Sequence, residues 1–267
     1  MWLFVRSLYA RFFSKNHFLI KINNRILDLA LSALGYNNYR NEKESGELFF
    51  IQKYLSNKSI SLCFDIGANV GNYSKLLLDN TKSNVISFEP LPFVFKKLSV
   101  NLSNYSDRVV LVNSGVGEKS ETLPIYFNEN ASVHASFSNE VKQVDYVSNT
   151  ESVMINVVSI DDYCRDNNIS EIDFIKIDTE GFEKEVFDGA KETFKIIQPK
   201  FIQIEFNWHQ LFRGHSLNKI AEMMKNYRIY QLLPYGVGLV ERDVNKPEAN
   251  IYHYSNFVFI RDDIMLN

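Results

Sequence analysis

The sequence predicts an α/β protein with a Rossmann-like, doubly wound and mostly parallel sheet of seven strands, an antiparallel edge strand and N-terminal helices. Two observations predict this fold. From residue 60 onward, short apolar runs alternate with amphipathic segments, which is typical of βαβ units. The first apolar run leads into a glycine-containing turn, DIGANVG (residues 65–71), as expected where a strand turns into a helix beside a ligand.

Composition indicates a soluble globular chain. It has 267 residues, 45% of them hydrophobic, and a formal net charge of −3. A near-neutral balance argues against nucleic acid as the main partner, because phosphate binding requires a basic face. Cys63 and Cys164 are too few for a disulfide framework and lie in apolar surroundings, so we expect buried thiols and a cytoplasmic protein.

Residues 1–57 are predicted to form a helical appendage that ends in the helically spaced segment ESGELFFIQKYL. Basic residues, from Arg6 to Lys21, interrupt its apolar beginning, so no run is long enough to cross a membrane. No small-residue cleavage site of a signal peptide follows. We expect the segment to pack on the domain or on a partner subunit of a homo-oligomer; contact with a membrane surface is the alternative.

Residues 58–267 are predicted to form one domain whose strands can be placed in order. Five parallel strands are expected within SLCFDIG, NVISFEP, RVVLVNS, DFIKID and FIQIEF. Residues 121–158 break the rhythm and predict a strand pair with a polar insertion around residues 128–152. After residue 207 we expect a short helix near SLNKIAEMMKN and two or three strands, of which NFVFIR is the last. One late strand is expected to add antiparallel at the edge of the sheet.

The turn DIGANVG is the first candidate binding site. Gly67 and Gly71 allow the backbone to turn tightly and approach a ligand, and the helix after it points its free amide groups at the same place. A dinucleotide-binding turn would have glycine where Asp65 stands. The pattern DxGxNxG, with Asn69, therefore favours a cation such as the sulfonium of S-adenosylmethionine over a pyrophosphate.

Two further strand ends offer cofactor contacts. Glu89 ends the second predicted strand, 18 residues after Gly71, where an acid can accept hydrogen bonds from both ribose hydroxyls. Because NAD would use a similar acid, a nicotinamide-dependent oxidoreductase stays an alternative. Asn113 and Ser114, after the third strand, are weaker candidates for contact with adenine, since both are common in turns.

At this point the chain resembles the FkbM family of class I S-adenosylmethionine-dependent methyltransferases, over roughly residues 44–206. The matching segments are SGELFF, DIGANVGNYS, FEP, VNSGVGE, SIDDYC, IKIDTEGFEKEVFDGA and IQIEF. The resemblance implies a class I methyltransferase fold and O-methylation, often of sugar or polyketide hydroxyls. The acceptor that it suggests is a sugar of a bacterial surface polysaccharide, lipopolysaccharide or glycolipid.

Acids at the ends of the fourth and fifth strands are the catalytic candidates, because parallel strands present their carboxyl ends to one ligand site. A sugar hydroxyl needs a general base. We expect Asp178 to be that base or to orient the acceptor, with Glu180 as the alternate base. Glu183 either contacts substrate or stabilises the first turn of a helix, and Glu205 is a candidate acceptor contact.

Residues after the fifth strand and in the insertion complete the set of candidate site residues. His209 is a candidate base or acceptor contact, Trp208 could stack on a sugar face, and His134 could face the cleft. No residue is assigned to a metal; Mg²⁺ held by Asp178 with Glu205 or Asn207 is an alternative. A non-catalytic binding module on the same fold is the remaining alternative, disfavoured because packing alone requires none of the polar motifs. The expected partner is a small-molecule or glycan acceptor.

Overall fold

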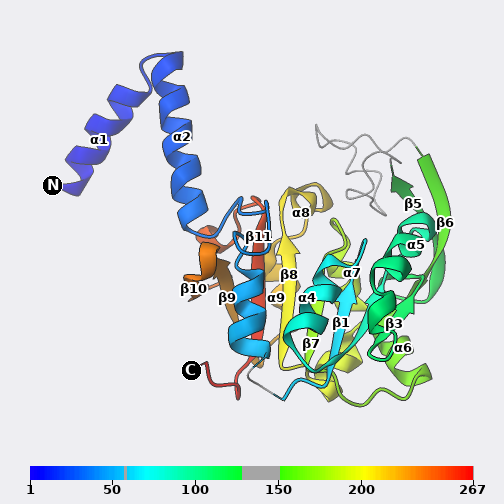
Figure 1. Ribbon diagram of the computed structural model, residues 1–267. Helices are drawn as coiled ribbons and strands as arrows, with labels where there is room; N and C mark the ends of the chain where they lie inside the picture. Colours follow the sequence, from blue (N-terminus) through cyan, green and yellow to red (C-terminus); the bar gives the residue numbers. More distant parts are fainter. Residues whose placement is uncertain (57–58, 128–150, 267) are drawn as a thin grey trace.

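We analysed a computed structural model of the chain, which describes residues 1–56, 59–127 and 151–266. Two helices, α1 (Trp2–Phe13) and α2 (His17–Ala33), project from a body built around a central sheet (Figure 1). Helices cover both faces of that sheet, and each face has its own buried apolar cluster. The molecule therefore has the three layers of a doubly wound α/β protein.

In the described residues, eight strands form the main sheet in the order β10-β9-β11-β8-β7-β1-β2-β3. Their bounds are β1 (Leu62–Ile66), β2 (Asn84–Phe88), β3 (Val109–Val112), β7 (Phe174–Ile177), β8 (Phe201–Phe206), β9 (Tyr227–Leu233), β10 (Gly238–Glu241) and β11 (Ser255–Arg261). The five strands from β3 to β8 are parallel. The chain runs outward from β1 to β3 and then returns to β7 on the other side of β1. The predicted fold class is confirmed, and the switch between β1 and β7 is where such sheets bind ligands.

The strand count differs from the prediction, since the described residues form eight strands in the main sheet rather than seven. The predicted antiparallel edge strand is β10, whereas NFVFIR belongs to β11, which lies antiparallel between β8 and β9. The four residues from Phe257 to Ile260 are fully buried. A run with no alternation between apolar and polar residues is typical of a central strand, so the sequence itself indicated the central position of β11.

A smaller sheet of β4 (Gly115–Val116), β6 (Glu151–Val158) and β5 (Glu121–Phe127) lies beside β3 (Figure 1). β5 and β6 pair antiparallel, which confirms the predicted strand pair. Most of the insertion predicted around residues 128–152, with His134, lies outside the described residues.

The helices of the body divide between the two faces of the main sheet. On one face lie α3 (Glu47–Phe50), the π-helical turn η1 (Ile51–Leu55), α4 (Asn72–Asn80) and α5 (Pro92–Asn101), and on the other lie α6 (Ile160–Asp166), α7 (Glu183–Asp188) and α9 (Leu217–Ala221). The short helix α8 (Trp208–Arg213) follows directly after β8. Polar side chains cap three of these helices: Ser159, Asn207 and Ser216 each accept a backbone hydrogen bond from the first turn.

The segment between α2 and β1 packs as part of the body. Phe50, Ile51 and Leu55 are fully buried in the same apolar cluster as Phe174. Tyr36 is also buried, and its hydroxyl donates to the carbonyl of Glu248. We therefore propose that the appendage predicted over residues 1–57 comprises only α1 and α2. Among the described residues, no helix is long and apolar enough to cross a membrane.

Candidate active site

A pocket lies at the carboxyl ends of β1, β2 and β7. It is lined by residues of four segments, 66–69, 88–90, 114–116 and 178–180, together with Ile125. The structure thus brings predicted cofactor residues (Gly67, Asn69, Glu89 and Ser114) together with Asp178 and Glu180, the predicted catalytic acids. These side chains come from four separate parts of the sequence, and the parallel arrangement of the strands is what places them in one pocket.

The glycine loop fits tightly between β2 and β7. The backbone N–H groups of Gly67 and Ala68 donate to the carbonyl of Phe88, at 3.1 and 2.9 Å. Gly67 has a φ of +83°, and a Cβ added there would lie 1.8 Å from the backbone oxygen of Asp178. Gly71, with a φ of +91°, precedes α4 and packs against Leu98. Both glycines are therefore required by the path of the backbone itself.

Glu89 is buried at the end of β2, where its carboxylate accepts hydrogen bonds from the backbone N–H groups of Asn69 (3.0 Å) and Leu91 (2.9 Å). Burial raises the pKa of Glu89 to about 7, although these hydrogen bonds act against the increase. The side chain of Asn113 donates to the carbonyls of Glu89 and Pro90. Asn113 thus fixes the turn after β2 and is not among the residues that line the pocket.

Asp65 lies at the end of β1 as predicted, but it is not among the residues that line the pocket. It is only 1% exposed and accepts a hydrogen bond from the hydroxyl of Ser74 on α4. Burial raises the pKa of Asp65 to about 6. Successive residues of a strand face opposite sides of the sheet, and Asp65 faces α4. Its carboxylate connects β1 with α4 beneath the glycine loop, and we propose that it supports the loop instead of contacting the cofactor.

Lys176, in the middle of β7, is a functional candidate that the sequence reasoning missed. Its side chain is only 3% exposed, and its Nζ lies 3.2 Å from Oδ2 of Asp178 and 3.7 Å from Oε1 of Glu47. Burial alone would lower the pKa of Lys176, but the carboxylates of Asp178 and Glu47 outweigh this effect and raise it. The signal was present in the sequence, because a lysine inside an apolar strand is rarely buried without a partner.

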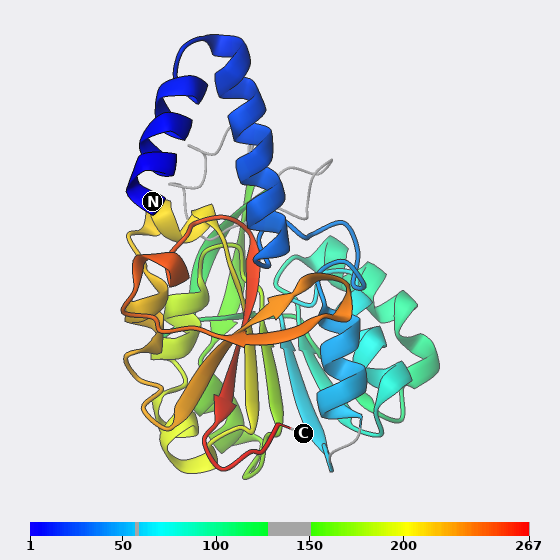
Figure 2. The same ribbon diagram turned by 90° about the vertical axis from the view of Figure 1, so that its left-hand side faces the viewer.

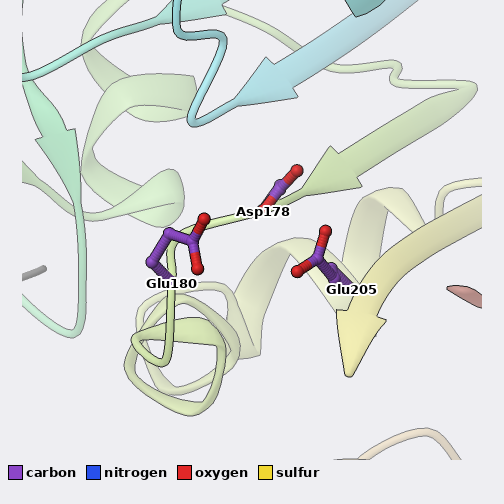
Figure 3. Close-up of side chains that lie close together, drawn as sticks. All are labelled: Asp178, Glu180 and Glu205. Carbon is purple, nitrogen blue, oxygen red and sulfur yellow. The ribbon is translucent and has the colours of Figure 1, made fainter. Parts of the chain in front are cut away.

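Three carboxylates converge beside the pocket. Oxygen atoms of Asp178, Glu180 and Glu205 all lie within 4.8 Å of one another, and Figure 3 shows the three groups turned toward a common space. Burial raises the pKa of Glu180 and of Glu205 well above the usual range, and the charge of Asp178 raises both further. The charge of Asp178 thus disfavours the ionised forms of both glutamic acids.

Two residues predicted to act on substrate lie behind this cluster. His209 is 0% exposed and outside the pocket lining; its Nδ1 lies 2.8 Å from Oε2 of Glu180. Glu183 is also buried and accepts hydrogen bonds from the backbone N–H groups of Thr179 and Gly181 and from the hydroxyl of Thr179. Because both side chains are covered, we propose that they position the 178–181 turn and do not contact the acceptor.

The residues that follow β8 differ from one another in their contacts and in their exposure. Asn207 caps α8, accepting from the backbone N–H of His209, and its side-chain amide donates to Glu205 at 2.7 Å. Trp208 is 40% exposed, so its ring remains a candidate for stacking on a sugar. Arg213, at the end of α8, forms an ion pair with Glu185.

Comparisons with known proteins indicate a methyltransferase family. A family model described as "Methyltransferase FkbM domain" matches residues 65–230, more than half of the chain. The chain is 23% identical over 195 residues to 2-O-methyltransferase NoeI of Sinorhizobium fredii, covering 68% of this chain and 79% of NoeI. It is 25% identical over 141 residues to hexuronic acid methyltransferase AglP of Haloferax volcanii, covering 53% of this chain and about half (54%) of AglP.

Similar solved structures have low sequence identity to the chain. Precorrin-6y C5,15-methyltransferase from Geobacter metallireducens is 9% identical, with 84% of this chain and 91% of that chain covered at a TM-score of 0.44. The fibrillarin pre-rRNA processing protein of Methanococcus jannaschii is 14% identical, with coverages of 83% and 76% and a TM-score of 0.44.

Proposed function

The chain belongs to the FkbM methyltransferase family, and from this premise we propose that it transfers the methyl group of S-adenosylmethionine to a hydroxyl group of a sugar. The observation that carries the proposal is that a single pocket holds both Glu89 and the pair Asp178 and Glu180. The names of NoeI and AglP support a sugar acceptor. The finer assignment, a sugar of a bacterial surface polysaccharide, lipopolysaccharide or glycolipid, follows from the family resemblance.

The residues of the pocket fit S-adenosylmethionine. Glu89 can accept hydrogen bonds from ribose hydroxyls, because each carboxylate oxygen has a second lone pair beyond its backbone hydrogen bond. The side-chain oxygen of Asn69 is buried and has no hydrogen-bond partner among the described residues. A buried acceptor without a partner is costly, and a donor group of the cofactor would satisfy it. A pyrophosphate would find no GxGxxG turn, which disfavours the nicotinamide alternative.

The acids at the end of β7 and β8 supply the proton chemistry. When bound, S-adenosylmethionine supplies a methyl group on a positively charged sulfur. Asp178 lines the pocket, so we propose that it accepts the proton of the acceptor hydroxyl or orients that hydroxyl. Glu180 is the alternate base, held in place by His209. Lys176, which is buried outside the pocket lining, positions Asp178 through its ammonium group.

We further propose that the reaction needs no divalent ion. Mg²⁺ would take oxygen ligands such as those of Asp178, Glu180 and Glu205, and their spacing makes a site conceivable. However, the ammonium group of Lys176 already brings a positive charge to 3.2 Å from Asp178, so this carboxylate has a cationic partner without a metal ion.

The proposal can be tested by incubating the protein with S-adenosylmethionine and a panel of neutral sugars, uronic acids and their glycans. We expect a methyl ether, which survives mild alkali, whereas a methyl ester on a uronic acid would be hydrolysed. Product formation should be unchanged by EDTA; a loss that Mg²⁺ restores would contradict the metal-free reaction. Calorimetry should show binding of S-adenosylhomocysteine and none of NADH, and the reverse result would overturn the function.

The raised pKa of Glu89 predicts pH-dependent cofactor binding. The ionised carboxylate accepts hydrogen bonds best, so the affinity for S-adenosylhomocysteine should fall about tenfold for each unit below the pKa of about 7. Glu89→Gln should weaken binding about 10- to 100-fold and abolish most of this dependence. Titration calorimetry at about pH 8 and about pH 6 measures both effects.

The pH dependence of cofactor binding and the pH dependence of folding stability have opposite signs, so the two can be told apart. Because the pKa of Glu89 is raised in the folded protein, its contribution to folding stability is fully present below the ordinary value of 4.5 and is lost as pH rises through about 7. Stability from this group thus decreases over the range in which binding should improve. An unchanged pH profile in the Glu89→Gln variant would assign the dependence to another group, such as Asp65.

A further inference from the structure

The hairpin formed by α1 and α2 exposes most of its apolar side chains. None of the residues of α1 is buried, and Leu31 is the one buried residue of α2. Of the 24 large apolar side chains that are exposed in the described part of the chain, 14 lie in residues 1–34. A contiguous exposed apolar surface of this kind marks a place where another surface binds.

Polar residues on the hairpin are arranged in stripes. In α2, His17, Lys21, Asn24 and Asp28 follow one another at a spacing of three or four residues, so they share one side of the helix. In α1, the exposed residues Phe4, Leu8 and Phe12 have the same spacing and form an apolar side. The hydroxyl of Tyr9 donates to Asn23, which joins the two helices. Both helices are therefore amphipathic, as is typical of helices that lie in a membrane interface.

The charge of the hairpin is opposite to that of the remaining chain. Residues 1–34 contain five lysine or arginine residues and one acid, Asp28, giving a net charge of +4. Because the whole chain has a net charge of −3, the rest carries −7. A basic, aromatic-rich surface complements a bilayer with anionic headgroups, whereas hairpins of two copies would repel each other. The body offers no comparable partner, since its ten exposed large apolar residues in the described ranges are spread from Tyr39 to Met265.

The hairpin is joined to the body at a well-packed point on the pocket side. Both views show it projecting beyond the ends toward which the parallel strands run (Figures 1 and 2). Immediately after α2, Tyr36 is buried and the backbone N–H of Asn37 donates to Tyr254 at 2.8 Å. Gly35, with a φ of +99°, lies so close to β9 that an added Cβ would be 2.6 Å from the carbonyl oxygen of Leu232. A surface bound by the hairpin would therefore lie toward the pocket end of the body.

We propose that α1 and α2 bind the surface of a lipid bilayer that contains anionic phospholipids, and that this binding turns the pocket end of the protein toward the membrane. The apolar sides of the helices enter the interface between headgroups and acyl chains, and the basic residues meet the headgroups. The surface binding stands on the hairpin alone and is independent of the methyl acceptor.

Sedimentation of the full chain with lipid vesicles tests the proposal. We expect it to bind vesicles of phosphatidylcholine with about 30% phosphatidylserine, and to bind phosphatidylcholine alone at least about tenfold more weakly. Raising NaCl from about 0.1 M to about 0.5 M should weaken binding to the anionic vesicles, because salt screens surface charge.

Matched variants separate the contribution of the basic residues to vesicle binding from that of the apolar residues. Replacing Arg6, Arg11 and Lys15 together by Gln should reduce affinity for the anionic vesicles about 100-fold. The same replacement of the exposed body residues Lys119, Lys195 and Lys246 removes equal charge and should change affinity less than about threefold.

A second pair of variants tests the apolar side. Replacing Phe4, Leu8 and Phe12 together by Ser should reduce affinity at least about tenfold. The equivalent change of Val100, Ile196 and Val237, which are exposed on the body, should leave binding intact. All of these residues lie outside the pocket lining, and a cooperative thermal unfolding transition like that of the unaltered chain serves as the folding control.

Three results would overturn the proposal. The first is that the full chain sediments with neither kind of vesicle. The second is that it binds both kinds equally and the body variants weaken binding as much as the hairpin variants do. The third is that light scattering shows an oligomer for the unaltered chain and a monomer for the variant changed at Phe4, Leu8 and Phe12, and that the unaltered chain does not bind vesicles. The hairpin would then bind a second copy of the chain. None of these results depends on catalysis, so the proposed function would stand or fall separately.

Discussion

Replacing Asp178 by Asn is expected to lower the rate of methyl transfer about 10²- to 10⁴-fold, the range typical of losing a general base. The substitution keeps the size of the side chain and removes its ability to accept a proton. Asp178 lines the pocket, and its Oδ2 lies 3.2 Å from the ammonium group of Lys176. Turnover rates measured at saturating acceptor, with calorimetric binding of S-adenosylhomocysteine on the same preparation, check the expectation.

Substitutions of Glu180 and Asp107 provide the comparison for Asp178→Asn. If Glu180 is the base instead, Glu180→Gln will show the large loss of turnover and Asp178→Asn a small one. Asp107→Asn, which changes an exposed acid away from the pocket, should be indistinguishable from the unaltered protein. Undiminished turnover in both pocket variants, with the cofactor still bound, would show that neither acid is the base. A loss of S-adenosylhomocysteine binding in Asp178→Asn would mean that the residue acts on the cofactor site.

Gly67→Ala should have the largest effect on folding. The added Cβ would lie 1.8 Å from the backbone oxygen of Asp178, a clash that requires the glycine loop and the end of β7 to separate. The backbone at Gly67 also has a φ of +83°, which is unfavourable for alanine. We expect a loss of at least about 4 kcal/mol in the free energy of unfolding, as for the most damaging single substitutions.

Gly214 provides a matched control for this variant. It too has a positive φ, +67°, but an added Cβ would meet nothing within 4 Å. Gly214→Ala should therefore cost only the backbone strain, about 1 to 2 kcal/mol. The difference between the two variants in urea-induced unfolding isolates the clash with Asp178. Equal losses of stability would show that the loop can move away from β7 at little cost.

Motifs at strand ends were the part of the site that the sequence could predict. Gly67 and Glu89 lie in the pocket because strands in a parallel sheet present their carboxyl ends to one side, and this rule requires no coordinates. The same rule brought Asp178 and Glu180 to that pocket, although they lie 89 and 91 residues after Glu89 in the chain. Agreement between a local pattern and the topology of the sheet made these residues predictable.

The direction of individual side chains could not be predicted in the same way. Asp65 faces α4, and His209 is covered behind Glu180, although both are polar residues beside the expected cleft. Whether a side chain next to a strand end faces the ligand or the protein depends on the packing of the neighbouring helices. Lys176 is the opposite case, because its central position in an apolar strand is by itself a sign of a buried charged partner.

The position of β11 determines when the sheet can be completed as the chain is made. β8 (residues 201–206) and β9 (residues 227–233) are synthesised earlier, yet they do not pair with each other in the main sheet. Each pairs with β11, which comes from residues 255–261. Until these residues emerge from the ribosome, the adjoining edges of β8 and β9 have backbone groups without their final partner, and such open edges favour association between chains. A nascent chain that stalls before residue 255 thus holds the pocket motifs but has a divided sheet.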